Sequence, residues 1–334
     1  MIKLKKDKVY FVGEVGINHA GSSKKIKYYI DLASKYGIDA IKLQLGNPCK
    51  FTTIENEKRF KLRTKTMIGV SEIDNLIKYS KKKNILLFAS PITEDYVSFV
   101  AKKFGVIKIA SGDINFLPIL KQANKTNKLT IISTGASTLD EISNIFKIFK
   151  NKKKVILMHC ISNYPTNIDN ANLVNVEFLR KKFGVDVGYS NHVLGTTACE
   201  VAVSLGARLI EFHFTDNKRR SFIDHQISFE PKDFLRLKKK SEEIIKSIGN
   251  NRIKQFPSEK NYKELRKGII YLQNLKKGSI LKEKDLGYAR PAKYFSFNQK
   301  NNLIGKKLKK NVKKYFLTRK ADFTWKQNIL HYQS

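Results

Sequence analysis

Residues 106–135, VIKIASGDINFLPILKQANKTNKLTIISTG, contain a short apolar run, a helix-like stretch and a second apolar run. Both apolar runs are nearly continuous, as expected of parallel strands that are buried on both faces. Each run ends in small or polar residues, and the same pattern recurs through the first two-thirds of the chain. It predicts eight strands, at 8–16, 39–44, 85–91, 106–111, 129–135, 154–160, 186–190 and 208–215.

Helices are predicted between these strands, at 23–36, 71–83, 93–104, 114–124, 138–150, 172–183 and 195–205, with a last one at 231–247. Eight alternating strand–helix units in about 250 residues are typical of a (β/α)8 TIM barrel. A doubly wound open sheet is the alternative, but it usually carries a glycine-rich phosphate loop. The chain has neither a GxGxxG nor a Walker motif. We therefore expect an α/β fold, with a TIM barrel over residues 1–250.

The sequence pattern changes after about residue 250. Residues 251–275 are interpreted as a linker with one short helical segment. Residues 276–334 combine short strand-like runs with glycine-containing turns, which predicts a small C-terminal all-β domain. A domain of about 60 residues has a thin core, so we expect it to pack against the barrel or against another subunit.

The composition of the 334-residue chain limits the classes of function. Lys and Arg number 65 and Asp and Glu number 29, which gives a net charge of +36. That charge suits a polyanion partner, but the lysines are spread along the whole length, as a bias in composition would place them. The three cysteines are far apart, which excludes a disulfide scaffold or a zinc finger. With no signal peptide or membrane-spanning run, we expect a cytoplasmic protein that binds neither membrane nor nucleic acid.

Polar residues collect where the predicted strands end. Chemistry in a TIM barrel takes place at the C-terminal ends of the strands, so these residues are candidates for a site. They are Glu14, Lys42, Gln44, Lys108, Ser111, Ser133, Ser162, Asn163, Tyr164, Ser190, His192, Glu211 and His213. Each taken alone has a simpler explanation, such as a helix cap or a hydrogen-bonded core residue. Their regular placement on consecutive strands points instead to one shared site.

Two subsets suggest specific ligands. His192 and His213 follow neighbouring strands, which lie about 5 Å apart, so their imidazoles can share one cation such as Mn²⁺, Zn²⁺ or Fe²⁺. Lys42, Lys108 and the strand-end serines supply positive charge and hydroxyl donors, which fit a phosphate or a carboxylate. The sequence therefore predicts a metal and an anion at the same rim.

Several motifs, in the same order along the chain, resemble those of the sialic acid synthase family, which includes the N-acetylneuraminate, legionaminate and pseudaminate synthases. The motifs are EVGINHAGS, IKLQ, KIASGDI, ISTGAST, HCISNYPT, GYSNHVLGTTA, GARLIEFHFT and DHQISFEP. The segment RKGIIYLQNLKKGSILKEKDLGYARPA resembles the antifreeze-like (SAF, β-clip) domain of that family. The resemblance implies condensation of phosphoenolpyruvate with an N-acylated hexosamine of the N-acetylmannosamine type, giving a nine-carbon 2-keto acid and phosphate. It also implies a divalent metal, manganese or alternatively magnesium, and a domain-swapped homodimer.

The resemblance also implies roles for individual residues. Glu14, Lys42, Lys108 and Glu211 would be catalytic, and His192 and His213 would hold the metal. Substrate binding would fall to Gln44, Ser111, Ser133, Ser162, Asn163, Tyr164, Ser190, Asp224 and, from the partner subunit's small domain, Arg290. The chain departs from the family where Asn191 replaces an aspartate, where Ala89-Ser90-Pro91 replaces Ser-Thr-Pro and where Phe222-Ile223 precedes Asp224. These departures bear on the identity of the sugar.

Two other functions remain open from the residues alone. A pyruvate aldolase that forms a Schiff base through Lys108 would use the same barrel, but it has no need of two histidines. A basic nucleic-acid-binding protein would account for the charge and would bind with a steep salt dependence. Its aromatic residues, however, would alternate with basic clusters, and here they fall within apolar runs.

Overall fold

The computed structural model describes the chain except for residues 1, 3, 222, 250–257, 260 and 326–334. The chain divides into two compact units, Met1–Gly249 and Asn250–Ser334. Part of the predicted linker and the end of the predicted small domain therefore lie outside the described residues, as does Phe222.

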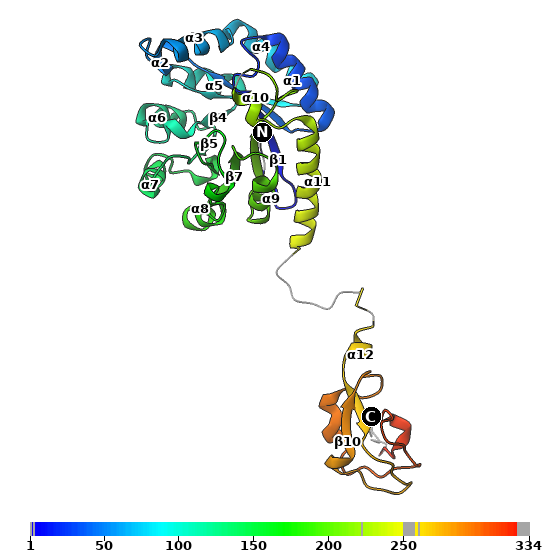
Figure 1. Cartoon of the computed structure of the whole chain (residues 1–334). Coiled ribbons are helices and arrows are strands. Elements are labelled where there is room, and N and C mark those ends of the chain that lie inside the picture. Colours follow the sequence, from blue (N-terminus) through cyan, green and yellow to red (C-terminus); the bar gives the residue numbers. More distant parts are fainter. Residues whose placement is uncertain (1, 3, 222, 250–257, 260, 326–334) are drawn as a thin grey trace, which may run out of the picture. The chain divides into compact units, whose positions relative to one another are not determined.

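In the first unit, parallel strands close into a barrel in chain order (Figure 1). The strands are β1 (Tyr10–Glu14), β2 (Ala40–Leu45), β3 (Leu86–Pro91), β4 (Val106–Ile109), β5 (Leu129–Ser133), β6 (Val155–His159), β7 (Asp186–Asn191) and β8 (Leu209–His213). The barrel closes between β1 and β8, with Tyr10 paired to Leu209 and Glu14 to His213. The prediction of a (β/α)8 TIM barrel is confirmed.

Helices surround the barrel at the predicted places. They are α1 (Ser23–Tyr36), α4 (Val70–Lys82), α5 (Val97–Phe104), α6 (Leu117–Lys125), α7 (Leu139–Ile148), α8 (Asn175–Phe183), α9 (Thr197–Ser204) and α11 (Pro231–Ile248). Three further helices were not expected from the sequence: α2 (Pro48–Phe51), α3 (Glu57–Thr66) and α10 (Ile223–Ile227). The first two of these lie between β2 and α4, and the third follows β8.

The interior of the barrel is apolar at one end and polar at the other. Side chains two residues apart on a strand share a face, and one inward position is apolar while the next is polar. The inward pairs are Val12 and Glu14, Ala40 and Lys42, Val106 and Lys108, Ile131 and Ser133, and Leu209 and Glu211. The first member of each pair belongs to one buried apolar cluster, and the second lines a cavity at the strand ends. The apolar layer thus forms the floor on which the polar layer rests.

The second unit has a core of its own. It contains α12 (Tyr262–Leu265) and two antiparallel strands, β9 (Gly268–Tyr271) and β10 (Leu286–Ala289). The strand β9 lies within the stretch predicted as a linker. The core is formed by Ile269, Tyr271, Leu281, Leu286, Phe295, Leu303, Leu308, Val312 and Phe323. Its identity as an antifreeze-like domain stays a prediction.

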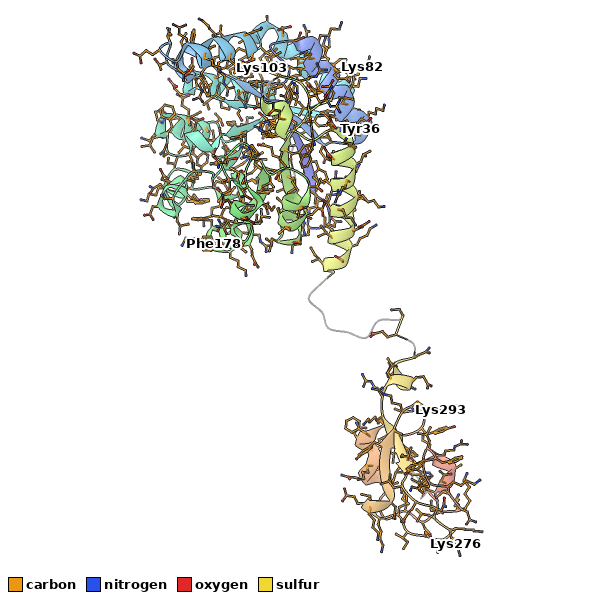
Figure 2. The ribbon with its side chains drawn as sticks, viewed as in Figure 1. Tyr36, Lys82, Lys103, Phe178, Lys276 and Lys293 are labelled. Atoms are coloured by element: carbon orange, nitrogen blue, oxygen red, sulfur yellow. The ribbon has the colours of Figure 1, made fainter. Side chains whose placement is uncertain are left out.

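Charged side chains cover both units. Lys82 on the barrel, and Lys276 and Lys293 on the second unit, are exposed (Figure 2). The positive charge is therefore distributed over both units. None of the helices in the described part of the chain has the length and apolar character that a membrane crossing requires.

Candidate active site

A cavity of about 530 Å³ lies at the C-terminal ends of the barrel strands. The structure brings most of the predicted site residues to its wall: Glu14, Lys42, Gln44, Lys108, Ser111, Ser133, Tyr164, Ser190, His192, Glu211, His213 and Asp224. These residues come from seven strands or the loops that follow them, and from α10. Alternate residues of each strand point into the barrel, and the closed barrel brings the ends of its strands together. Residues that are distant in the sequence therefore meet.

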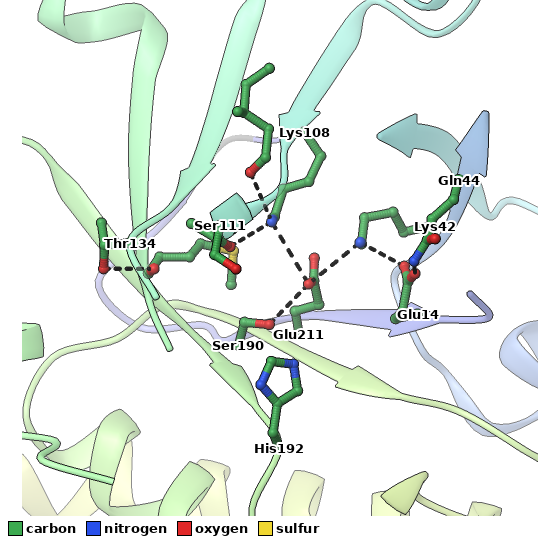
Figure 3. A network of polar contacts seen from close by, with 12 residues as sticks. Glu14, Lys42, Gln44, Lys108, Ser111, Thr134, Ser190, His192 and Glu211 are labelled. Atoms are coloured by element: carbon green, nitrogen blue, oxygen red, sulfur yellow. Dashed lines mark hydrogen bonds and ion pairs between the residues drawn. The ribbon is translucent and has the colours of Figure 1, made fainter. Parts of the chain in front are cut away.

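Glu211 is the centre of a buried ionic network (Figure 3). Its Oε1 lies 3.5 Å from Lys42 Nζ and 3.9 Å from Lys108 Nζ. Ser190, its register partner on β7, donates a hydrogen bond of 3.0 Å to the same oxygen. Lys42 Nζ also lies 2.7 Å from Glu14 Oε2. Two lysines and two carboxylates therefore alternate across the barrel mouth.

The contacts within this network favour the charged forms of Glu211 and Lys42. Burial alone would raise the pKa of the Glu211 carboxyl, but Lys108 and Lys42 outweigh it and hold that pKa well below its usual range. Burial likewise opposes the charge on Lys42, yet Glu14 and Glu211 prevail and raise the pKa of Lys42. The balance differs for Lys108, where burial lowers the pKa and the attraction of Glu211 offsets it only in part.

Hydroxyl groups lie beside Lys108. Its ammonium donates a hydrogen bond of 2.6 Å to Ser133 Oγ and one of 3.3 Å to the Ile109 carbonyl. Ser111 and Ser162 share a hydrogen bond of 2.9 Å between their hydroxyl groups. A lysine next to several rotatable hydroxyls can bind the oxygens of a phosphate or carboxylate.

The two predicted metal-binding histidines are buried neighbours. The ring centroids of His192 and His213 are 5.6 Å apart, and the ring of Tyr164 lies 4.1 Å from that of His192. His192 Nδ1 is 2.6 Å from the Ile161 carbonyl. Because a carbonyl only accepts, Nδ1 carries the proton and Nε2 keeps its lone pair. Burial, with a smaller effect of His213, lowers the pKa of His192 to about 4, so the ring is neutral near pH 7.

On the other side of Glu14, the network continues to an arginine that the sequence analysis missed. Gln44 Nε2 donates a hydrogen bond of 2.8 Å to Glu14 Oε1. Arg63 Nη1 in turn donates one of 2.7 Å to Gln44 Oε1. Asp224 and Gln44 both border Gly16. A Cβ added to Gly16 would lie 2.7 Å from Asp224 Oδ2 and 3.8 Å from Gln44 Nε2. Gly16 also has a φ of +53°, so this close approach needs glycine.

Asn163 of the barrel and Arg290 of the second unit were also predicted. Asn163 is exposed and its carbonyl accepts a hydrogen bond from Thr166, and its side chain does not line the cavity. Arg290 is exposed on the second unit. Ser162 does not line the cavity itself, but it shares a hydrogen bond with Ser111, which does.

Other residues line the cavity without having been predicted. They are Phe51, Arg59, Arg63, Ser90, Ile92, Ala110, Gly112, Asp113 and Cys160. Asp113 lies two residues after Ser111, at the end of a predicted strand, so its position in the sequence could have identified it. Arg59 and Arg63 are carried by α3. The start of α3 has a sequence signal, since the Asn56 side chain caps the backbone of Arg59.

Comparison with known proteins places the chain in a family. Residues 29–253 match the NeuB family. The N,N'-diacetyllegionaminic acid synthase of Campylobacter jejuni is 33% identical over 93% of this chain and 99% of its own length. The N-acetylneuraminate-9-phosphate synthase of Drosophila melanogaster is 34% identical over 69% of this chain and 66% of its own length.

A solved structure agrees with these matches. The N-acetylneuraminic acid synthetase of Leptospira borgpetersenii serovar Hardjo-bovis, crystallised in complex with citrate, is 34% identical. It superposes with a TM-score of 0.75 over 79% of this chain and 94% of that chain. The chain therefore belongs to the NeuB family, and the resemblance to the sialic acid synthases found in its sequence is confirmed.

Proposed function

We propose that this enzyme condenses phosphoenolpyruvate with the open-chain aldehyde of an N-acylated hexosamine. C3 of phosphoenolpyruvate attacks the aldehyde carbon, water adds at C2, and phosphate leaves by C–O cleavage. The products are a nine-carbon 2-keto sugar acid and phosphate. The observation that carries the proposal is the pairing, on one barrel rim, of a lysine–serine cluster with two neighbouring buried histidines in a member of the NeuB family.

Lys108 and the serines around it would hold phosphoenolpyruvate. The hydrogen bond from Lys108 to Ser133, and the nearby Ser111–Ser162 pair, place a cation and three hydroxyls together. Glu211, 3.9 Å away, opposes the effect of burial on the Lys108 pKa and so favours the charged form of this lysine. Lys42 would support the departing phosphate, because fixed charges in a buried site stabilise developing charge without reorganising.

Glu14 and Glu211 would direct the proton transfers. Each is buried and each faces Lys42. A carboxylate held ionised at the point where water adds can orient that water and accept its proton. Of the two, Glu211 also accepts a hydrogen bond from Ser190, which would hold its carboxylate toward the proposed phosphoenolpyruvate site.

The histidine pair fits a divalent cation. His192 has a neutral ring with a free Nε2, and His213 Nδ1 is buried with no hydrogen-bond partner among the described residues. Within those residues no group of three His, Cys, Asp or Glu side chains could enclose a metal, so the remaining positions would be filled by water or by the sugar. Bound there, Mn²⁺ or Mg²⁺ would polarise the sugar's carbonyl oxygen as a Lewis acid. Asp224, whose Oδ2 is 3.6 Å from His213 Nδ1, would orient the sugar chain.

The second unit would complete the site in a homodimer. We propose that Arg290 of one subunit contacts the acyl end of the sugar bound in the barrel of the other. The planar guanidinium offers several donors in fixed geometry, and Arg290 is exposed on its own unit. This arrangement would also explain why so small a unit is retained with the barrel.

One assay tests the reaction. The protein is incubated with Mn²⁺, N-acylated hexosamines and phosphoenolpyruvate labelled with oxygen-18 in the bridging position. We expect sugar-dependent release of phosphate carrying the label, loss of activity in EDTA, and loss of activity in His192→Ala and His213→Ala. Lys81→Ala, an exposed site on α4, is the matched control. Label retained in the keto acid, or trapping of pyruvate on Lys108 by borohydride, would contradict the proposal.

A further inference from the structure

Two arginines at one end of the cavity have no carboxylate partner in the described part of the chain. Arg59 and Arg63 both line the cavity, and both stack on the ring of Phe51, with guanidinium-to-centroid distances of 5.2 and 4.4 Å. Being four residues apart on α3, they project from the same face of the helix. Among the described residues, no carboxylate lies within ion-pair distance of either guanidinium. The two guanidinium groups lie against the same ring and repel each other. An anion bound between them would relieve this repulsion.

The proposed phosphoenolpyruvate site and the arginine pair are at opposite ends of a chain of contacts. The contacts run in sequence from Ser133 through Lys108, Glu211, Lys42, Glu14 and Gln44 to Arg63. Lys108 and the serines therefore occupy one end of the chain of contacts and Arg63 the other. An anion bound at Arg63 would be separate from phosphoenolpyruvate, although both would lie in the same cavity.

Arg63 lies on the side where the sugar would extend from the histidine pair. Asp224 approaches both His213 and the neighbourhood of Gln44, and its charge acts on Arg63. Burial lowers the pKa of Arg63, and the attraction of Asp224 opposes that effect only in part. Glu14 also attracts Arg63, but it is already paired with Lys42. Of these two carboxylates only Asp224 is left to balance the two guanidinium groups, so this end of the cavity keeps an excess of positive charge.

We infer that Arg63 and Arg59 bind a phosphate monoester on the sugar substrate, at the end remote from its aldehyde. This inference rests on the proposed function and specifies the substrate class. Guanidinium groups bind phosphate through paired, charge-assisted hydrogen bonds. Phosphoenolpyruvate adds three carbons at C1 of the hexosamine, so C6 of the sugar becomes C9 of the product. A hexosamine 6-phosphate would thus yield a nonulosonate 9-phosphate.

The test compares N-acetylmannosamine with its 6-phosphate at saturating phosphoenolpyruvate and Mn²⁺. We expect the wild-type enzyme to favour the 6-phosphate in kcat/KM by about tenfold to a hundredfold, the range for hydrogen bonds to charged groups. Arg63→Gln should reduce this preference at least tenfold, and Arg59→Gln should reduce it less because Arg59 is exposed. The matched control is Lys58→Gln on the same helix, which does not line the cavity.

The ratio between the two sugars separates binding from structural effects. If Arg63 only positioned Gln44, its replacement would lower the turnover of both sugars equally and leave the ratio unchanged. The preference should also shrink between about 0.1 M and about 1 M salt, because salt screens charge. Equal or better turnover of the neutral sugar by the wild-type enzyme would overturn the inference and leave the proposed function intact. If neither sugar reacts, the proposed function fails for this sugar class. Calorimetric titration then decides the inference, which is overturned if the 6-phosphate binds no more tightly than the neutral sugar.

Discussion

Replacing Lys42 by Met would remove the cation between two buried carboxylates. Lys42 Nζ lies 2.7 Å from Glu14 and 3.5 Å from Glu211, and all three side chains are at most 7% exposed. Met has a similar length and no charge. Glu14 and Glu211 would then repel each other in a site with little access to water, while Lys108 compensates only Glu211, from 3.9 Å.

The expected loss follows from the cost of breaking a buried ion pair. Removing one partner of such a pair typically destabilises a protein by about 3–5 kcal/mol. Because Lys42 serves two carboxylates, we expect a value in the upper half of that range. With an m-value of about 3 kcal/mol/M in urea, a loss of about 4 kcal/mol lowers the unfolding midpoint by more than about 1 M. Turnover should fall by about a hundredfold or more, as when a charge that stabilises the transition state is removed.

A double-mutant cycle isolates the ion pair. Glu14→Gln relieves the repulsion that Lys42→Met creates, so the double variant should be more stable than the sum of the two single effects predicts. Unfolding is followed by far-ultraviolet circular dichroism, which reports on the barrel helices. The single tryptophan, Trp325, belongs to the second unit and not to the barrel, so circular dichroism is used in place of its fluorescence.

The control for this experiment is Lys82→Met. Lys82 is exposed on α4 (Figure 2), and its replacement should change the free energy of unfolding by no more than about 0.5 kcal/mol. If Lys42→Met destabilised the barrel by less than about 1 kcal/mol, or if the cycle showed no coupling between Lys42 and Glu14, the reasoning about the buried network would be refuted.

Three further predictions test other parts of the molecule. Gly16→Ala should abolish turnover, because the added methyl group would collide with Asp224 and the φ of residue 16 is positive. Normal kinetics in this variant would show that the close contact between Gly16 and Asp224 is not needed for activity. Burial raises the pKa of Asp113 from its ordinary 3.8 to about 6, so the wild-type protein should lose stability relative to Asp113→Asn as the pH rises from about 4 to about 6, and the difference should then level off. Melting temperatures measured across that range check the sign, and a difference that shrank with rising pH would contradict it. A protein lacking residues 276–334, mixed with His213→Ala under conditions of subunit exchange, should regain part of the activity; inactive heterodimers would refute the swapped arrangement.

Much of the site was predictable because its residues occupy strand ends. A buried parallel strand gives a short apolar run, and the residue that ends the run is placed by the barrel at its mouth. Lys108 and Ser133 were identified in this way, and the fold then placed them in hydrogen-bond contact. His192 and His213 were expected to be neighbours because their strands are consecutive, and their rings are 5.6 Å apart.

The segment that carries Arg59 and Arg63 gave no such signal. The helix α3, EKRFKLRTKT, is strongly polar, and Thr66 is its only fully buried residue among those described. Without an apolar stripe, periodicity does not predict a helix. The role of Arg63 depends on its hydrogen bond to Gln44, nineteen residues earlier, and on the ring of Phe51. Those contacts arise from packing of the loop over the barrel mouth, which no local pattern encodes.

The pairing of charges within the network was equally hidden, and the reason is geometric. Glu14 is the register partner of Lys42 on β2 and of His213 on β8, so neighbouring strands explain its contacts. Lys108 on β4 meets Glu211 on β8 across the barrel instead, and that contact depends on the diameter set by eight strands and their tilt. A list of strand-end residues gives the components of the rim. Only the closed barrel determines which lysine contacts which carboxylate, and therefore that the pKa of Lys42 is raised while that of Lys108 is lowered.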